Sequence, residues 1–150
     1  MMEELTIEEV LQKALDKEQE AHDFYARASD AAENPGGRVL LRELAEEELK
    51  HCELIRKVKA GRNWPELRVK QELHITEFLI DKPITPESTL QEILIYAMKR
   101  EDKAASFYGG RLSRALDGAL RSLFERLRQE ELNHKTRLEE LYDEVILSEN

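Results

Sequence analysis

Residues 44–51 read LAEEELKH and contain the sequence Glu48-x-x-His51. The same pattern returns 83 positions later, where residues 127–134 read LRQEELNH and contain Glu131-x-x-His134. A single Glu stands 30 positions before each Glu-x-x-His, at Glu18 and at Glu101. A pattern that recurs at one offset is typical of a duplicated structural unit. Four segments of the chain therefore each supply part of one repeated set of carboxylates and imidazoles.

The similarity between the two halves extends beyond these six residues. An alignment of residues 10–55 with residues 93–138 also pairs Phe24-Tyr25 with Phe107-Tyr108, Ala14 with Ala97, Ala21 with Ala104, Leu40 with Leu123, Leu44 with Leu127, Glu47 with Glu130 and Leu49 with Leu132. Glu is frequent in this chain, so one Glu-x-x-His alone would be weak support. The shared register favours duplication over coincidence.

The composition indicates one helical domain over residues 1–150. The chain has only 6 Gly and 4 Pro, and residues with high helix propensity dominate. Its net charge of −9 argues against nucleic acid as a partner. We find no apolar run long enough to span a membrane and no signal-peptide pattern at the N-terminus, so we expect a cytoplasmic protein. One cysteine excludes a disulfide within the chain.

Apolar residues at helical spacing predict four helices. Capping boxes are expected at Thr6 with Glu9 and at Thr89 with Glu92. The helices should run from Ile7 to a break at Asn34-Pro35-Gly36-Gly37, from Val39 to Gly61, from Thr85–Thr89 to Leu112, and, after a turn at Asp117-Gly118, from Leu120 to Val145.

The lengths of the connections predict how these helices are arranged. Two short connections make two antiparallel hairpins, and residues 62–86, with three prolines, form a long crossover between them. We predict a short helix within this crossover, around residues 66–80. An all-α four-helix bundle with one long crossover has the ferritin-like topology.

The placement of the six repeated residues predicts a metal site. Glu and His three positions apart share one helix face. Glu18 and Glu101 follow the apolar stripes of their helices, so four carboxylates should meet inside the bundle. Buried carboxylates repel one another unless they take up protons or bind cations. Two divalent ions would neutralise all four, which indicates a binuclear site.

The ligand types narrow the choice of metal. Carboxylate with imidazole suits iron or manganese and tolerates zinc, and the lack of thiolates argues against structural zinc. Cys52 should point away from the ligand face and serve as a small apolar residue. We interpret His22 and His74 as structural or exposed.

The segments EQEAHDFY, LAEEELKH, AMKREDKAASFY and QEELNHKTRLEELYDE resemble the rubrerythrin-related branch of the ferritin-like superfamily. The resemblance implies that Glu48 and Glu131 bridge two iron ions. It further implies that Glu18 and His51 complete one ligand shell, and that Glu101 and His134 complete the other. Tyr25 and Tyr108 would lie just outside the ligands, although ordinary core aromatics would show the same helical spacing.

Three features depart from the family pattern. Rubrerythrins proper carry a Cys-rich, rubredoxin-like tail, and this sequence lacks one. They also carry another Glu at the position of Ala104. Ferritins and bacterioferritins space the ligands of the first hairpin slightly more widely and lack a crossover of this long, proline-bearing kind. The first two departures bear directly on peroxidase activity, because they remove the built-in electron donor and a carboxylate associated with metal movement.

The leading functional hypothesis is a di-iron oxidoreductase that reacts with hydrogen peroxide or O2. An external donor such as a rubredoxin would reduce it again. One alternative is iron handling, as a ferroxidase or storage protein. Another is a bundle in which two metal ions chiefly stabilise the fold, and a metal-free scaffold is the simplest alternative. The resemblance implies a homodimer.

Overall fold

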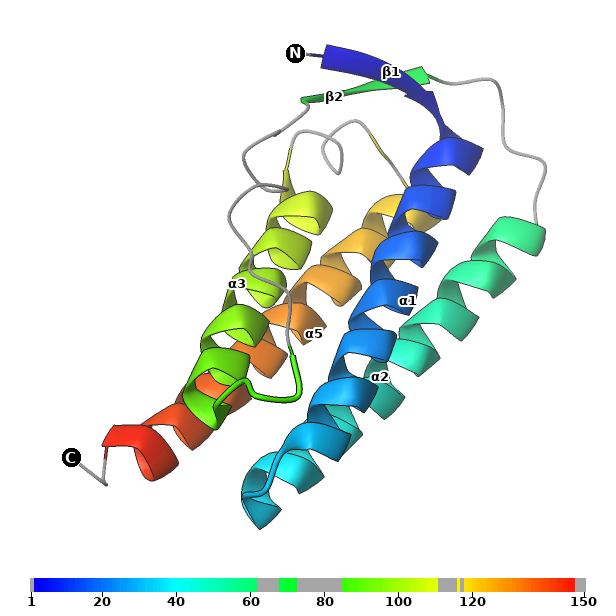
Figure 1. Ribbon diagram of the computed structural model, residues 1–150. Coiled ribbons are helices and arrows are strands. Elements are labelled where there is room, and N and C mark those ends of the chain that lie inside the picture. Colours follow the sequence, from blue (N-terminus) through cyan, green and yellow to red (C-terminus); the bar gives the residue numbers. More distant parts are fainter. Residues whose placement is uncertain (1, 62–67, 73–84, 111–115, 117, 148–150) are drawn as a thin grey trace.

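The computed structural model describes residues 2–61, 68–72, 85–110, 116 and 118–147. In chain order, the elements are β1 (Met2–Thr6), α1 (Ile7–Ala31), α2 (Pro35–Ala60), β2 (Arg68–Glu72), α3 (Leu90–Gly109), α5 (Gly118–Tyr142) and a short π-helix (Asp143–Leu147) (Figure 1). The four long helices of the described chain form a bundle, which confirms the predicted all-α fold class.

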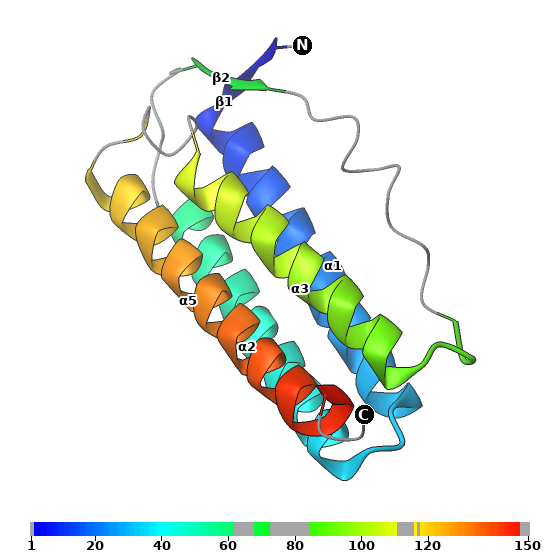
Figure 2. The same ribbon diagram turned by 90° about the vertical axis from the view of Figure 1, so that its left-hand side faces the viewer.

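The bundle consists of two helix hairpins. Helix α1 packs chiefly against α2, and α3 packs chiefly against α5. Figure 2 shows α3 and α5 side by side, with α1 and α2 behind them. Helix α2 ends near the small β-sheet, whereas α3 begins at the opposite end of the bundle. The second hairpin therefore begins at the end of the bundle opposite to the end where the first hairpin finishes, as the ferritin-like topology with its long crossover requires.

Local sequence signals set the starts of the helices. The Thr6 hydroxyl accepts a hydrogen bond from the backbone of Glu9 at 3.2 Å, and the Glu9 carboxylate accepts one from the backbone of Thr6. Thr89 and Glu92 make the same reciprocal pair at the start of α3. Both predicted capping boxes are confirmed. Such a cap typically contributes about 1 kcal/mol to helix stability.

Three predicted helix boundaries need correction. The break after the first helix is shorter than expected, because Pro35 already occupies the first turn of α2 and the Asn34 side chain caps that turn. Proline fits there, since the first helical N–H needs no partner within the helix. Helix α3 ends at Gly109, and Leu112 lies outside the described residues. Val145 belongs to the π-helix rather than to α5.

The predicted short helix around residues 66–80 is wrong where the structure describes that segment. Arg68–Glu72 is a strand that pairs antiparallel with Met2–Thr6, with Leu5 opposite Val69. Strand pairing depends on a partner that is distant in sequence, so it can override local helix propensity. Residues 66–67 and 73–80 lie outside the described part of the chain.

The core is divided by a polar layer. One apolar cluster, near the sheet, includes Leu11 and Phe124, and the other includes Phe24 and Leu138. Along α1 and α5, the buried Glu and His residues lie between the segments that form these clusters. Burying each large apolar side chain contributes about 1.5–3 kcal/mol. The two clusters can therefore support a polar layer that is itself costly to bury.

Not every apolar residue at helical spacing belongs to the core. Val39 and Leu49 of α2 are 56% and 38% exposed. Among the described residues, no helix combines the length and apolar character needed to cross a bilayer.

Candidate metal centre

The polar layer receives side chains from all four long helices. Its members share burial, since each is at most 3% exposed. They are Glu18 from α1, Glu48 and His51 from α2, Glu101 from α3, and Glu131 and His134 from α5. The structure thus brings together all six residues that the repeat singled out.

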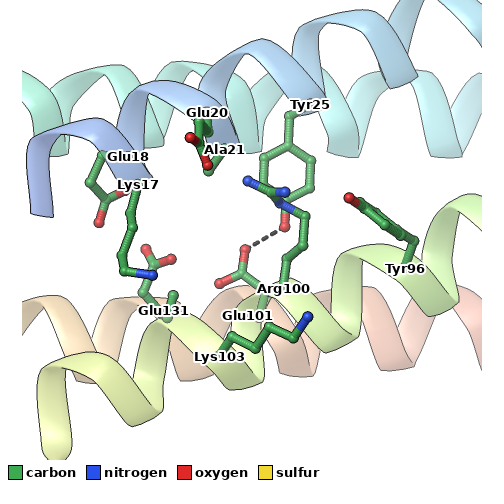
Figure 3. A pocket seen from close by; sticks show the side chains of 11 residues that line it. Lys17, Glu18, Glu20, Ala21, Tyr25, Tyr96, Arg100, Glu101, Lys103 and Glu131 are labelled. Carbon is green, nitrogen blue, oxygen red and sulfur yellow. Dashed lines mark hydrogen bonds between the residues drawn. The ribbon is translucent and has the colours of Figure 1, made fainter. Parts of the chain in front are cut away.

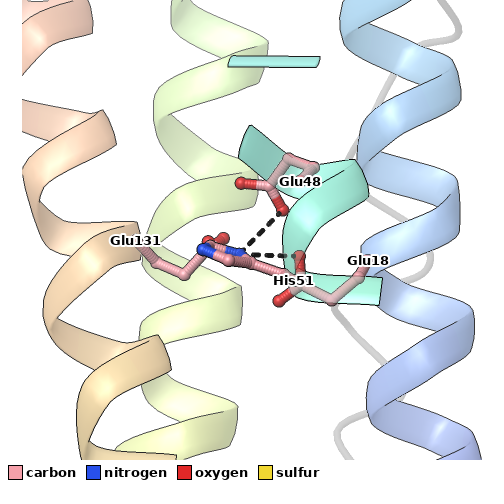
Figure 4. A group of neighbouring side chains, drawn as sticks. All are labelled: Glu18, Glu48, His51 and Glu131. Carbon is pink, nitrogen blue, oxygen red and sulfur yellow. Dashed lines mark hydrogen bonds and ion pairs between the residues drawn. The ribbon is translucent and has the colours of Figure 1, made fainter. Parts of the chain in front are cut away.

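The first half of the centre surrounds His51. Its Nδ1 atom lies 3.4 Å from a Glu18 oxygen and 3.1 Å from a Glu131 oxygen. Glu48, one turn earlier on the same helix, places an oxygen 3.8 Å from Nδ1. Figure 4 shows the imidazole between these carboxylates from three different helices. One nitrogen of His51 is therefore directed into the cluster.

The second half repeats this geometry around His134. Its Nδ1 atom lies 2.8 Å from a Glu48 oxygen, 3.5 Å from a Glu101 oxygen and 3.7 Å from a Glu131 oxygen. The two imidazole rings are stacked, with centroids 5.8 Å apart and planes inclined by only 9°. The sequence duplication therefore appears in space as two similar half-sites.

Two carboxylates belong to both half-sites. Ligand-type atoms of Glu18, Glu48, His51 and Glu131 lie within 4.8 Å of one another. The second group, formed within the same limit, consists of Glu48, Glu101, Glu131 and His134. Glu48 and Glu131 are common to both groups, so these two carboxylates stand between two potential ion positions.

Burial and mutual repulsion perturb the carboxyl groups. Burial, followed by the charge of Glu18, raises the pKa of Glu48 well above its ordinary value. Burial and the charges of Glu101 and Glu48 likewise raise the pKa of Glu131. For Glu18, burial opposes ionisation, but hydrogen bonds from neighbouring groups outweigh it and lower the pKa. Without a cation, this layer therefore holds protons on some of its carboxyl groups.

The pKa values of the two histidines are also raised, although burial alone would lower them. Burial lowers the pKa of His51, but its close contacts with the carboxylates of Glu131, Glu18 and Glu48 raise that pKa far more. The pKa of His134 is also raised, because its contacts with Glu101 outweigh burial. The metal-free layer therefore keeps positive charge on imidazoles that a metal ion would need in neutral form.

The unpaired polar atoms test whether the layer fits a metal. Neither oxygen of Glu48 makes a hydrogen bond, although both are buried. His134 Nδ1 lies 2.8 Å from one of them and also makes no hydrogen bond. Leaving such atoms unpaired typically costs about 1–3 kcal/mol for each group. Carboxylate and imidazole atoms that converge without hydrogen bonds are suited to a shared divalent cation, so these residues fit a binuclear metal group.

Two tyrosines contact the cluster across the bundle. The Tyr108 hydroxyl donates a hydrogen bond to Glu18 at 2.6 Å, and the Tyr25 hydroxyl donates one to Glu101. Both rings are fully buried, and burial together with the adjacent carboxylates raises both phenol pKa values. Each tyrosine thus contacts the buried glutamate on the first helix of the other repeat, a crossing that the sequence alone did not predict.

A cavity of about 260 Å³ between α1 and α3 reaches the centre. Glu18, Glu101 and Glu131 of the buried layer are among the residues that line it. The two equivalent alanines, Ala21 and Ala104, also line the cavity. Figure 3 shows that cationic side chains, including Arg100, lie among the lining residues. Small side chains at these repeated positions leave space beside the carboxylates, so a small molecule can approach them from the α1–α3 side.

The remaining predicted residues take structural roles where they are described. Cys52 is completely buried, and burial, followed by the charge of Glu18, raises the pKa of its thiol to about 11. It is therefore a poor nucleophile. His22 contacts the backbone oxygen of Ala45 through Nδ1 at 2.8 Å, as expected for a structural histidine. His74 lies outside the described residues.

The fold and the buried residues define a class: a ferritin-like bundle with two carboxylate–imidazole half-sites. The profile of the Rubrerythrin family matches residues 9–142. The chain belongs to the rubrerythrin family. Family membership and the buried Glu/His cluster fit a binuclear metal site. Among curated proteins, the sequence search found no match.

Two solved structures resemble this chain over most of its length. A hypothetical protein from Pyrococcus furiosus is 26% identical, with a TM-score of 0.68, and the match covers 93% of this chain and 89% of that one. A protein from Thermotoga maritima, named as a candidate ferritin-like diiron-carboxylate protein, is 24% identical with a TM-score of 0.71. That match covers 91% of this chain and 94% of the other. Both likenesses support the fold.

Proposed function

We propose that this chain is a di-iron carboxylate protein that reacts with hydrogen peroxide or O2 and is re-reduced by an external electron donor. The observation that carries this proposal is the pair of buried half-sites that share Glu48 and Glu131. Four carboxylates in one buried layer call for cations. Two divalent ions match their charge, and carboxylate with imidazole is a ligand set that suits iron.

Each side chain has a proposed role in this site. Glu48 and Glu131 bridge the two ions. Glu18 and His51 complete one ligand shell, and the equivalent residues Glu101 and His134 complete the other. Tyr25 and Tyr108 each hold one oxygen of a terminal carboxylate, which fixes the remaining oxygen toward the site. These assignments rest on the contacts around the cluster and on the symmetry of the repeat.

A pair of bound ferrous ions would supply the two electrons that peroxide reduction requires. Reduction of one hydrogen peroxide to two waters also consumes two protons. The cavity beside Ala104 offers the oxidant a path to the carboxylates, and apolar packing on both sides of the layer limits the access of bulk water. The chain therefore supplies the site, the access route and its shielding, while the electrons come from a separate donor.

Stopped-flow oxidation of the ferrous protein tests this function. The protein should be loaded with two ferrous ions per chain without oxygen and mixed separately with peroxide and with O2. Oxidation faster than that of free ferrous iron, with the product still bound and reducible for another cycle, supports the proposal. Oxidation no faster than that of free iron contradicts it. Fast oxidation followed by release or mineralisation of ferric iron would instead favour iron handling.

Ala104→Leu is expected to slow oxidation by peroxide without removing metal. The larger side chain would fill space in the cavity that leads to Glu101 and Glu131. If it adds about 1.4 kcal/mol to the access barrier, the rate falls roughly tenfold. Ser106→Leu is a suitable control because Ser106 is exposed on the same helix and does not line this cavity. Equal rates in the two variants would show that the oxidant enters elsewhere.

A further inference from the structure

Both histidines present one ring nitrogen to the cluster and the other to a carboxylate outside it. His51 directs Nδ1 to the buried glutamates, and its Nε2 lies 3.4 Å from an oxygen of Glu130. His134 does the same, with Nε2 3.8 Å from an oxygen of Glu47. The two rings therefore have the same orientation relative to the site.

The outer carboxylates come from equivalent positions of the repeat. Glu47 immediately precedes the buried Glu48, and Glu130 immediately precedes the buried Glu131. Each faces the histidine of the opposite hairpin, because Glu47 is on α2 and His134 is on α5. The arrangement is therefore reciprocal. A pair of unrelated surface contacts would not be expected to follow the internal symmetry of the chain.

Arginines hold both outer carboxylates in place. An Arg137 nitrogen lies 2.7 Å from Glu47, and Arg126 Nε donates a hydrogen bond to Glu130 at 3.0 Å. In each case, the arginine and the histidine approach the same carboxylate. Glu47 and Glu130 are only 38% and 36% exposed, so they lie at the boundary between solvent and the buried layer.

The contact between His51 and Glu130 has a chemical explanation. Its Nε2 atom is buried and has no hydrogen-bond partner. A neutral imidazole carries one N–H, and a carboxylate beside one nitrogen favours the hydrogen there. The other nitrogen is then free to bind a metal ion. The present separations of 3.4 Å and 3.8 Å are those of ion pairs and exceed a normal hydrogen bond.

We infer that Glu47 and Glu130 are positioning residues that orient His134 and His51 from across the bundle. Each carboxylate accepts the Nε2–H of its histidine and so directs Nδ1 to the metal. This inference rests on the binuclear site of the proposed function. It adds that each hairpin orients one histidine ligand of the other hairpin. The correct orientation of both histidines therefore depends on the packing of α2 against α5.

Zinc binding by the full chain provides the test, because Zn²⁺ is diamagnetic and has no redox chemistry. Glu47→Gln should weaken binding of one of the two ions by roughly 10–100-fold. Glu43→Gln is the matched control: Glu43 also contacts Arg137, at 2.5 Å, but it is not among the residues that contact His134. Competition with a coloured chelator would give the two affinities for each variant.

The tautomers of the histidines give a second measurement that a general loss of packing would not mimic. In ¹⁵N spectra of the zinc-loaded wild-type chain, both rings should carry hydrogen on Nε2. Glu47→Gln should perturb His134 alone, and Glu130→Gln should perturb His51 alone. Glu125→Gln removes a comparable surface ion pair with Arg121 and should perturb neither ring.

The outcomes separate this inference from the proposed function. If the wild-type chain binds two zinc ions but Glu47→Gln and Glu43→Gln behave alike, the positioning role is overturned and the binuclear site stands. If the wild-type chain binds fewer than two ions, both proposals fail. The inference is supported if each Glu→Gln substitution weakens only the zinc ion that is bound by the histidine facing that Glu.

Discussion

Glu48→Ala is expected to abolish the binding of both metal ions, whereas Glu18→Ala should remove mainly one. Glu48 is fully buried and belongs to both half-sites, while Glu18 belongs to only one. Loss of a shared carboxylate leaves two adjacent cations with too little negative charge in a poorly solvated layer. Metal content per chain, measured by elemental analysis after loading with ferrous iron and gel filtration, distinguishes the two results.

The repeat provides internal controls for this prediction. Glu131→Ala should behave like Glu48→Ala, and Glu101→Ala should behave like Glu18→Ala but affect the other ion. Circular dichroism should show that the Glu48→Ala chain still folds, since the substitution removes a source of repulsion from the metal-free layer. Equal metal loss in the Glu18 and Glu48 variants would contradict the bridging assignment. Anomalous scattering at the iron edge would show which position is lost.

The cluster could be predicted from the sequence because its geometry depends on local rules. Within one helix, a spacing of three residues places Glu48 and His51 on the same face. The bundle topology then requires only that the four apolar stripes meet. The helix starts could also be predicted, because the capping boxes at Thr6 and Thr89 involve contacts within four residues. Each of these features is determined over one or two helical turns.

The crossed tyrosines depend on a longer range of structure. Tyr25 follows Glu18 by seven residues, which is about 10.5 Å along a helix. Helices α1 and α3 run in opposite directions, so this displacement brings Tyr25 level with Glu101 rather than with Glu18. Tyr108 reaches Glu18 for the same reason. The relative height of two antiparallel helices is not encoded in either segment alone, so the sequence could not specify the partners.

The small sheet illustrates a second limit. The residues of β1 precede a strong helix start, and those of β2 lie in a segment predicted to be partly helical. Neither strand is convincing by itself, since an isolated two-stranded pair is only marginally stable. Packing provides the missing support: Leu5, at the end of β1, is buried in the apolar cluster that includes Leu11. Such long-range support is invisible in a short sequence window.

Removing the metal ions is expected to destabilise the protein, and more strongly at alkaline than at mildly acidic pH. At a free metal concentration about one hundred times Kd, binding of one ion stabilises the folded state by about 2.7 kcal/mol. For a chain of this size, that corresponds to roughly 5 to 11 °C in Tm. Chelation should therefore produce a large shift, because two ions are lost.

The sign of the pH effect follows from the perturbed groups. In the folded, metal-free chain, the pKa values of Glu48 and Glu131 lie above their ordinary value of 4.5. Those of His51 and His134 lie above 6.5. The folded state therefore binds more protons than the unfolded state, and the stability of the metal-free protein falls as the pH rises above these ordinary values. The pKa of Glu18 is shifted in the opposite direction, so its contribution to stability is lost only as the pH falls.

Bound divalent ions replace those protons, so the loaded protein should not lose stability by this route. Thermal unfolding followed by circular dichroism, with and without a chelator, should be compared at about pH 6 and about pH 9. The chelator-induced drop in Tm should be larger at the higher pH. In Glu48→Ala the chelator should have little effect at either pH, because the metal is already absent. A drop that is the same at both pH values, or larger at pH 6, would show that protons do not compensate for the missing cations.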